Sequence, residues 1–244
     1  MLGRTVLAEN FPKDWSAKKY FFVHIPKTGG TSLFDWLSHI YGADNCCEHI
    51  ESLILPEPSP DIIAHLRQFR LISGHVPIDY NNYFASDGFL PLTIVRDPVD
   101  QFFSHVNHLL TEDVEDGLLR GVREKARVSA GNFLEQATAE ELAFFESFQS
   151  KPIFGGLFDW RAASLADRIG WLRGNYAAVM TTETMQDELG RMLRSDEAAR
   201  AVFPALNVKH YRRDLLTNRQ RDILDDLLRQ DRFLHQALTQ LAVA

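Results

Sequence analysis

Six consecutive residues, from position 27 to position 32, carry the groups that proteins use to bind an oxyanion. One lysine, two glycines and three hydroxyl side chains follow one another there: Lys27, Thr28, Gly29, Gly30, Thr31 and Ser32. Glycine lets the backbone approach a phosphate-like group closely, and the first N–H groups of a helix have no partner inside that helix. The segment therefore predicts a phosphate or sulfate site. An ordinary turn with Thr31 as the helix cap is the structural alternative.

The residues on either side predict the elements that hold this segment. Tyr20–Ile25 is a short apolar run rich in aromatic residues, which is typical of a buried strand, and Pro26 ends it. Apolar residues then recur at helical spacing, so we expect a helix over Ser32–Tyr41. The order is strand, glycine-rich loop and helix. It brings the partial positive charge of a helix N-terminus to the loop.

A second group of polar residues follows the apolar strand predicted over Pro91–Val95. Arg96 stands at the carboxyl end of that strand, Pro98 suits the first turn of a helix, and Ser104 lies about two turns into it. The planar guanidinium of arginine can bind two phosphate oxygens at once. The pair predicts a second anion-binding position. An Arg96–Asp97 ion pair and a helix-surface serine are the structural alternatives.

A histidine stands at the end of a third predicted strand, near residues 70–73. Gly74 and His75 follow that strand directly. Ligands of open α/β sheets bind at the carboxyl ends of the strands, and a neutral imidazole can take a proton from a hydroxyl. His75 is therefore the candidate general base, with His24 and His105 as its nearest competitors. A loop or core histidine satisfied by the backbone is the structural alternative.

The segment H-I-P-K-T-G-G-T-S differs from the P-loop of nucleoside triphosphatases, in which the lysine follows the glycines. It resembles the 5′-phosphosulfate-binding loop of sulfotransferases, and most closely that of the heparan sulfate 2-O-sulfotransferase family and its bacterial relatives. The pattern R-D-P-x-x-x-x-x-S resembles the 3′-phosphate motif of sulfotransferases. The segment S-G-H-V resembles the part of the family that carries the base histidine. Gln101 stands where many relatives have a second arginine.

This resemblance implies an enzyme that moves a sulfuryl group from 3′-phosphoadenosine 5′-phosphosulfate (PAPS) to an acceptor hydroxyl, leaving 3′,5′-ADP. Lys27 would then stabilise the leaving oxygen, and His75 would take the hydroxyl proton. Arg96 and Ser104 would hold the 3′-phosphate. The family favours a carbohydrate acceptor, while tyrosine, lipid and metabolite hydroxyls stay open. The scheme requires no metal, and the sequence shows no clear metal cluster.

Two other functions fit parts of the sequence. A phosphotransferase that uses ATP and Mg²⁺ needs a Ser or Thr after the loop lysine and an Asp at a strand end, and Thr28 and Asp97 stand at such positions. A non-catalytic nucleotide-binding module would bind 3′,5′-ADP without transferring anything. Magnesium-dependent ATP binding would favour the first alternative, and binding without transfer would favour the second.

Apolar strands near residues 20–25, 70–73, 91–95 and 176–180 alternate with helical patterns, which predicts a parallel sheet covered on both faces. The resemblance implies the three-layer α/β fold of sulfotransferases, with P-loop-like topology. No linker-like segment divides the chain. We therefore expect one domain over residues 1–244, with residues 1–19 as an N-terminal arm.

Several local features are expected between and after these strands. They are a loop over Gly42–Pro60, a short helix capped by Asp61, a helical region over Thr111–Ser150, a loop over the acceptor at Lys151–Arg161, a helix over Thr184–Leu193 and one long helix over Thr217–Leu241. Thr138 and Thr217 open capping-box patterns. We interpret Glu183 as structural, and Asn207 and Lys209 as weak candidates for contacts near the nucleotide.

The 244 residues carry a net charge of −7 and no Lys/Arg-rich run, which argues against a general nucleic-acid binder. An acidic protein with an anionic ligand must concentrate its positive charge locally. Cys46 and Cys47 are adjacent and predict neither a disulfide framework nor a zinc site. No continuous apolar segment precedes residue 20, so we expect a soluble cytoplasmic protein without a membrane span. The sequence does not reveal the oligomeric state.

Overall fold

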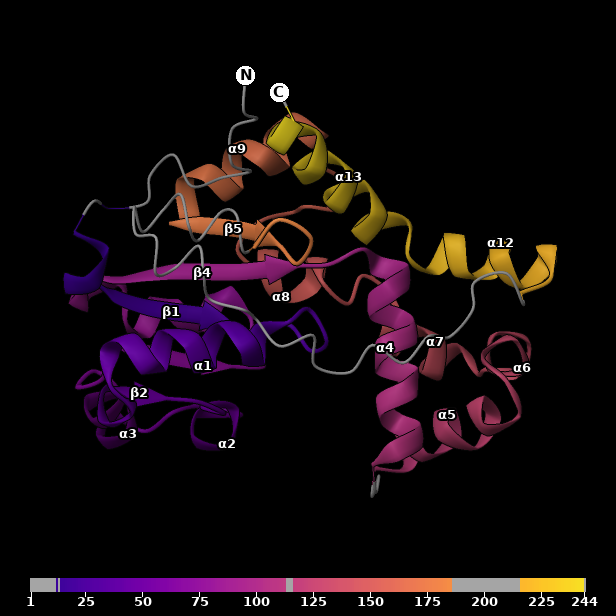
Figure 1. The fold of residues 1–244 in the computed structure, drawn as a ribbon, viewed down its shortest axis with the longest axis horizontal. Coiled ribbons are helices and arrows are strands. Elements are labelled where there is room, and N and C mark those ends of the chain that lie inside the picture. The colour runs from indigo at the N-terminus through magenta and orange to yellow at the C-terminus, as the bar shows by residue number, and fades with distance from the viewer. Residues whose placement is uncertain (1–11, 13, 113–115, 186–215, 244) are drawn as a thin grey trace.

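The computed structural model describes residues 12, 14–112, 116–185 and 216–243. Within these residues, five strands form one parallel sheet in the order β2-β3-β1-β4-β5 (Figure 1). The strands are β1 Lys19–Val23, β2 Cys46–Cys47, β3 Leu71–Gly74, β4 Phe89–Val95 and β5 Ala178–Thr181. In the central strand β1, Val23 pairs with Gly74 of β3 and with Thr93 of β4. The predicted parallel sheet is confirmed.

Helices cover both faces of the sheet. They are α1 Gly30–Tyr41 on one face, and α8 Ser150–Phe154, α9 Leu165–Asn175 and α13 Arg229–Val243 on the other. Successive strand side chains point to opposite faces, and this alternation divides the core. Tyr20 and Phe22 pack in the cluster that contains α1, whereas Phe21 and Val23 pack in the cluster that contains α8, α9 and α13. The three-layer α/β fold is therefore confirmed (Figure 1).

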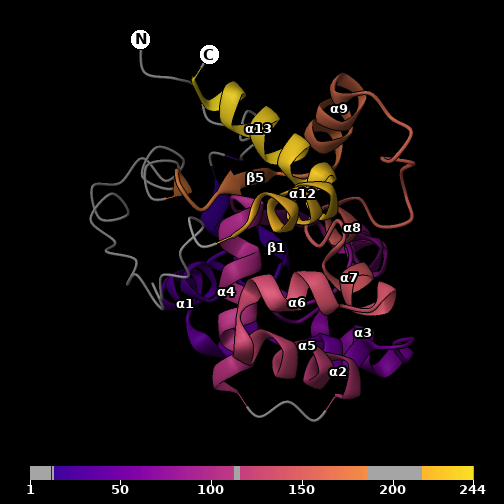
Figure 2. The same cartoon turned by 90° about the vertical axis from the view of Figure 1, so that its right-hand side faces the viewer.

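A second group of helices lies beyond the carboxyl ends of the strands. It consists of α4 Pro98–Thr111, α5 Gly117–Val128, α6 Ala130–Gln136, α7 Ala139–Phe145 and α12 Asn218–Leu227. α4 runs across the end of β4, and α5, α6 and α7 lie on the side of α4 away from the sheet (Figures 1 and 2). Their apolar side chains form a third core cluster around Phe102, Phe133 and Phe145. Within this group, α4 is therefore the helix next to the strand ends, and α5, α6 and α7 lie beyond it.

The segment predicted as a loop over Gly42–Pro60 contains regular structure. It holds a 3₁₀ turn η2 Ala43–Asn45, the strand β2 and the helix α2 Glu51–Ile54. β2 is too short to show an alternating pattern, and only its pairing with β3 identifies it as a strand. The following helix, α3 Pro60–Leu66, is capped by Ser59 and not by Asp61, because the Ser59 hydroxyl accepts a hydrogen bond from Ile62 N. Further 3₁₀ turns are η1 Trp15–Ala17, η3 Ile78–Tyr83 and η4 Ala85–Asp87.

The single C-terminal helix predicted over Thr217–Leu241 is two helices, α12 and α13. The predicted capping box at Thr217 is present at the start of α12. Leu224 of α12 packs in the cluster around α4, whereas Leu238 of α13 packs in a sheet cluster. The break between them lets one stretch of chain contribute to both clusters, which the helical periodicity alone could not reveal.

The helical region predicted over Thr111–Ser150 is present as α5, α6 and α7, apart from residues 113–115, which the structure does not describe. Thr138 forms the predicted capping box with Glu141. The loop predicted over Lys151–Arg161 begins instead as α8, and its Trp160 is only 3% exposed. Ile153, Phe154 and Trp160 of this segment pack in a sheet cluster, and a contact of its exposed residues with an acceptor stays a prediction.

Some expectations fall on residues outside those that the structure describes. They are most of the N-terminal arm, most of the helix over Thr184–Leu193, and Asn207 and Lys209. Among the helices of the described residues, none combines the length and the apolar character that crossing a bilayer requires.

Candidate active site

The loop between β1 and α1 holds two residues in the left-handed backbone conformation. Lys27 has φ 68°, and Gly29, which caps α1, has φ 91°. Glycine adopts this conformation readily, whereas another residue pays about 1–3 kcal/mol. Among the described residues no side chain caps α1, and the helix already begins at Gly30, so a Thr31 cap is wrong. The first N–H groups of α1 therefore face the loop without a capping side chain.

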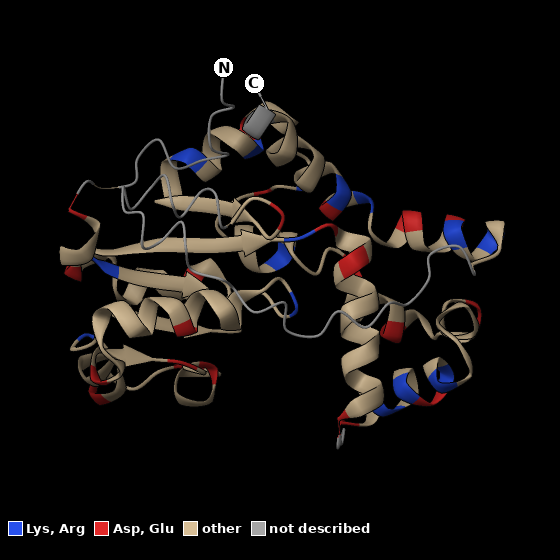
Figure 3. Cartoon of the chain, in the orientation of Figure 1, with Lys and Arg blue, Asp and Glu red and all other residues tan. Residues whose placement is uncertain are grey.

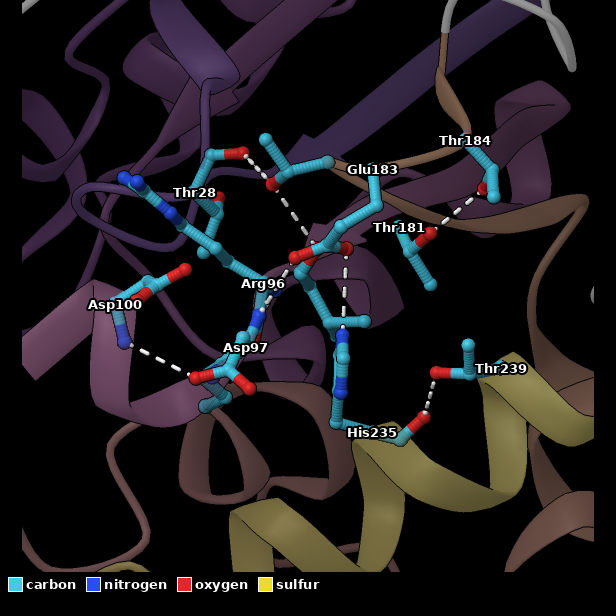
Figure 4. A network of polar contacts seen from close by, with 12 residues as sticks. Thr28, Arg96, Asp97, Asp100, Thr181, Glu183, Thr184, His235 and Thr239 are labelled. Atoms are coloured by element: carbon cyan, nitrogen blue, oxygen red, sulfur yellow. Dashed lines mark hydrogen bonds and ion pairs between the residues drawn. The ribbon is translucent and has the colours of Figure 1, made fainter. Parts of the chain in front are cut away.

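Thr28 points into the protein. Its side chain is fully buried, and its Oγ1 donates to the Ile25 carbonyl at 2.9 Å. Its own carbonyl accepts a hydrogen bond from Thr182 Oγ1 at 2.5 Å (Figure 4). The prediction that the Thr28 hydroxyl donates to a ligand is therefore wrong, and only a contact through its backbone stays a prediction. Thr31 is exposed and Ser32 half-buried, and their ligand contacts also stay predictions.

Lys27 and Arg96 follow neighbouring strands, β1 and β4, and their two motifs meet. Arg96 Nη1 donates to the backbone carbonyl of Lys27 at 3.2 Å. Burial and the nearby Arg96 charge lower the pKa of the Lys27 amino group, while Glu112 opposes this change. Neither cation forms an ion pair with another described residue. Figure 3 shows positive residues after β1 and at the end of β4, and two positive charges close together suit an anion.

A buried glutamine holds the backbone of Arg96. Gln149 Oε1 accepts from Arg96 N, and Gln149 Nε2 donates to Arg96 O, each at 2.9 Å. Gln149 is fixed in turn by Asp231 of α13, whose carboxylate accepts from Gln149 N, Ser150 N and the Ser150 hydroxyl. Gln149, Ser150 and Asp231 are each at most 1% exposed. The C-terminal helix therefore positions the arginine through two intervening contacts.

Residues after β5 hold the start of α4 (Figure 4). Glu183 Oε1 accepts from Asp97 N at 3.0 Å, and Glu183 Oε2 lies 3.3 Å from His235 Nε2. Asp97 caps α4, since its carboxylate accepts from Val99 N and Asp100 N. Burial raises the pKa of Glu183, but the hydrogen bonds from His235 and Asp97 outweigh it and lower the pKa. These contacts agree with a structural role for Glu183.

Gln101 and Ser104 lie three residues apart on α4 and share one side of that helix. The buried Gln101 side chain donates from Nε2 to the Pro26 carbonyl at 2.9 Å. Gln101 therefore ties α4 to the Lys27 loop. Ser104 is half-buried, and its contact with a 3′-phosphate stays a prediction.

His75 directly follows β3, on the side of β1 opposite to Arg96. Its Nδ1 lies 2.7 Å from the His24 carbonyl oxygen, so the neutral ring donates from Nδ1 and keeps a lone pair on Nε2. Its backbone N–H donates to Glu51 Oε2 at 3.0 Å. The residue is exposed. An oriented imidazole with an open basic nitrogen suits a general base.

The competing histidines, His24 and His105, are both buried. The His24 ring stacks on Phe22 with centroids 5.3 Å apart and planes inclined by 10°. His105 lies among Phe144, Phe145 and Phe148. Burial lowers the pKa of each of the two imidazoles to about 3, which makes both weak proton acceptors.

The structure also brings together three residues that sequence reasoning did not combine: His49, Glu51 and His75. One ligand atom of each lies within 4.8 Å of the others, although no metal cluster was expected. The sequence signal was weak because β2 and α2 are short and lie in a segment that the sequence predicts as a loop. His49 stands between these two elements, and Glu51 is the first residue of α2. Gln149 and Asp231 were missed for a different reason, since their contacts join residues about 80 positions apart, with Gln149 N 3.0 Å from Asp231 Oδ2.

No protein-family model and no curated protein matches the sequence. Among solved structures, the chain is similar to the crystal structure of mouse sulfotransferase SULT7A1 complexed with PAP. The identity is 14%, the match covers 97% of this chain and 94% of that chain, and the TM-score is 0.46. A likeness this distant carries no argument about activity. The narrower resemblance to heparan sulfate 2-O-sulfotransferases also stays a prediction.

Proposed function

We propose that this chain transfers a sulfuryl group from PAPS to an acceptor hydroxyl. The hydrogen bond from the Arg96 guanidinium to the Lys27 carbonyl carries this proposal, because it joins two cationic positions at adjacent strand ends. PAPS has anionic groups at both its 5′ and its 3′ positions. Lys27 and Arg96 form no ion pair with a described carboxylate. Two such cationic positions fit a nucleotide with two separate anionic groups better than a nucleotide with a single phosphate chain.

The donors divide naturally between the two anionic groups. Lys27 and the first N–H groups of α1, from Gly29 to Ser32, would hold the 5′-phosphosulfate. Arg96 and Ser104 would hold the 3′-phosphate, with Arg96 fixed by Gln149. When bound, PAPS supplies an activated sulfuryl group with a phosphate as its leaving group.

The residues of this chain then divide the chemistry between them. Lys27 supplies positive charge where negative charge grows on the leaving oxygen, which is the electrostatic part of catalysis. His75 Nε2 takes the proton of the attacking hydroxyl, because Nδ1 already donates to the His24 carbonyl. Such a positioned base typically contributes about 10²–10⁴-fold to the rate. Glu51 holds the backbone of His75 and so helps to orient the base.

We propose a carbohydrate hydroxyl as the acceptor. The support for this class is the resemblance of the Lys27 and His75 segments to those of carbohydrate sulfotransferases. Transfer assays with matched saccharide, phenol and lipid alcohols test it. Preference for a phenol or a lipid alcohol would replace the carbohydrate while leaving the reaction type unchanged.

Two contacts count against the ATP- and Mg²⁺-dependent phosphotransferase. That enzyme needs the hydroxyl after the loop lysine and a strand-end carboxylate as metal ligands. The Thr28 hydroxyl is buried and donates to Ile25 O, and the Asp97 carboxylate caps α4. Both groups are therefore already engaged. The non-catalytic module remains an outcome of the transfer assay.

Nucleotide preference tests the proposal. The chain should bind 3′,5′-ADP more tightly than ADP, because the 3′-phosphate has its own cationic position. Arg96→Ala should remove most of the difference, about 1.5–3 kcal/mol for a hydrogen bond to a charged group. Calorimetry with both nucleotides measures it. Arg229→Ala, at the exposed start of α13, is the matched control and should keep the preference. Equal affinity of the unaltered chain for the two nucleotides would overturn the proposal.

A further inference from the structure

We infer that His49, Glu51 and His75 form a binding site for a zinc-like divalent transition metal ion. Their ligand atoms lie within 4.8 Å of one another at the carboxyl end of β3. Two imidazoles and one carboxylate make a donor set that zinc sites with an open position use. The three ligands come from two segments that the β2–β3 pairing brings side by side.

His75 and Glu51 already have outer partners of the kind expected around a metal, and His49 has a carboxylate nearby. Metal-binding histidines usually donate their second ring N–H to a carbonyl or carboxylate. His75 Nδ1 donates to His24 O at 2.7 Å, which leaves Nε2 for the ion. Glu51 Oε2 accepts from His75 N, while its Oε1 lies 3.2 Å from His49 Nδ1. His49 Nε2 lies 3.9 Å from Glu48 Oε2, close enough for a small movement to form the corresponding contact.

A buried polar atom points to the same place. His24 is 5% exposed, and its Nδ1 has no hydrogen-bond partner among the described residues. That atom lies 3.8 Å from Glu48 Oε1, and the His24 ring is 4.6 Å from the His75 ring. If the His49 ring draws Glu48 toward the ion, the carboxylate becomes a shared outer partner for the two histidines. Gly74 makes room for this arrangement, since a Cβ there would lie 2.5 Å from Glu51 Oε2.

The geometry also indicates how the site closes. Ligand atoms about 2.0–2.2 Å from a tetrahedral zinc ion lie about 3.3 Å apart, so the cluster must contract by up to about 1.5 Å. His49 can supply this movement because its side chain is 63% exposed. His75 and Glu51 are held by the contacts described above and move less. Imidazole ligands favour Zn²⁺ or Co²⁺ over Mg²⁺, which prefers oxygen ligands and water.

The ion and the acceptor hydroxyl would compete for the same atom. His75 Nε2 is the nitrogen that takes the hydroxyl proton in the proposed transfer, and a metal bound there removes its lone pair. Zinc should therefore inhibit the reaction. This consequence rests on the proposed function, whereas the metal site itself does not.

Metal binding by the untagged full chain, without nucleotide or acceptor, tests the site. Titration with Zn²⁺ by calorimetry and with Co²⁺ by visible absorption should each show one equivalent. His49→Ala should weaken binding by more than the 10–100-fold that loss of an outer partner typically costs. Glu48→Gln should fall within that roughly 10–100-fold range. Circular dichroism checks that each variant is folded, and His49 is suited to this test because it is exposed.

Three controls make the result decisive. His39→Ala, on the exposed end of α1, should bind the metal like the unaltered chain. The double variant Cys46→Ser, Cys47→Ser should also keep binding, which excludes the neighbouring thiols as ligands. Mg²⁺ should not replace Zn²⁺. No binding, binding unaffected by His49→Ala, or binding lost with the cysteines would each overturn the site. Because no activity is measured, a failure of the proposed transfer reaction leaves this test intact.

Discussion

The His75 imidazole is held at Nδ1 by a backbone carbonyl, and its Nε2 has no hydrogen-bond partner among the described residues. His75→Asn could keep a hydrogen bond to the acceptor but could not take its proton. We expect the transfer rate to fall by about 10²–10⁴-fold. The affinity for 3′,5′-ADP should stay the same, because His75 belongs to neither cationic position. Metal-free assays of transfer from PAPS, with calorimetry of 3′,5′-ADP, measure both quantities.

His24→Asn and His105→Asn are the comparisons for this variant. Both residues are buried, so their loss should reduce thermal stability more than His75→Asn does. Rates corrected for the folded fraction should stay well above that of His75→Asn. A near-normal rate in His75→Asn, together with a collapse in one of the others, would assign the base elsewhere.

Gly30 shows how tightly the start of α1 packs against His24. A Cβ at position 30 would lie 2.1 Å from His24 Cδ2 and 2.3 Å from Nε2. Gly30→Ala should therefore lower the free energy of unfolding by about 1–3 kcal/mol, the usual cost of overpacking. Gly170→Ala, on α9, is its matched control, since no described atom beyond its chain neighbours and its own helix backbone lies within 4 Å of the added methyl group. It should stabilise the chain by about 0.5–1 kcal/mol. In urea unfolding, the free energy of unfolding should fall for Gly30→Ala and rise for Gly170→Ala. Equal changes in the two variants would contradict this packing argument.

Between elements, α8 and α13 determine where the arginine after β4 lies. Gln149→Met removes both hydrogen bonds to the Arg96 backbone while keeping a similar side-chain volume. We expect the preference for 3′,5′-ADP over ADP to shrink, with a smaller change in the affinity for ADP, because Arg96 is proposed to bind the 3′-phosphate directly and contacts the Lys27 loop through one backbone carbonyl. Calorimetry with both nucleotides measures the two affinities.

The exposed Gln136 on α6 supplies a control of the same chemistry. Gln136→Met removes a hydrogen bond to Asn132 far from the strand ends and should leave the nucleotide preference unchanged. If Gln149→Met reduced both affinities equally, Gln149 would support the site as a whole and not the arginine in particular.

Elements with a long, regular pattern could be predicted from the sequence. β1, β4 and α4 follow apolar runs or stripes that Pro26 and Pro98 delimit. β2 could not be predicted, because two residues show no periodicity and its existence depends on β3. The cationic residues at the strand ends could be predicted as candidate site residues because they follow apolar runs closely in the sequence. The Thr28 hydroxyl turned inward because a nearby carbonyl, Ile25 O, satisfies it, and such a choice depends on three-dimensional packing.

Across the whole molecule, the core consists of sheet clusters and a helical cluster that meet at α4 and at the break between α12 and α13. We propose that the chain is one domain that unfolds in a single transition. Leu224→Ala in the helical cluster and Leu238→Ala in a sheet cluster each leave a cavity that should cost about 2–5 kcal/mol. Both should lower the same transition.

The four tryptophans make this test informative. All of them pack in or against the sheet clusters, so their fluorescence reports on the sheet side, whereas circular dichroism reports on helices of both sides. Both signals should change together in every variant. Leu157→Ala, at a position 48% exposed, is the control and should have little effect. A helical signal lost before the fluorescence in Leu224→Ala would divide the chain into two units.

At position 27, the residue that best fits the left-handed backbone differs from the residue that the proposed reaction needs. Glycine would occupy that conformation without the cost of about 1–3 kcal/mol that lysine carries there. At position 27 the chain thus carries a positive side chain next to the first N–H groups of α1 at a cost in folding free energy.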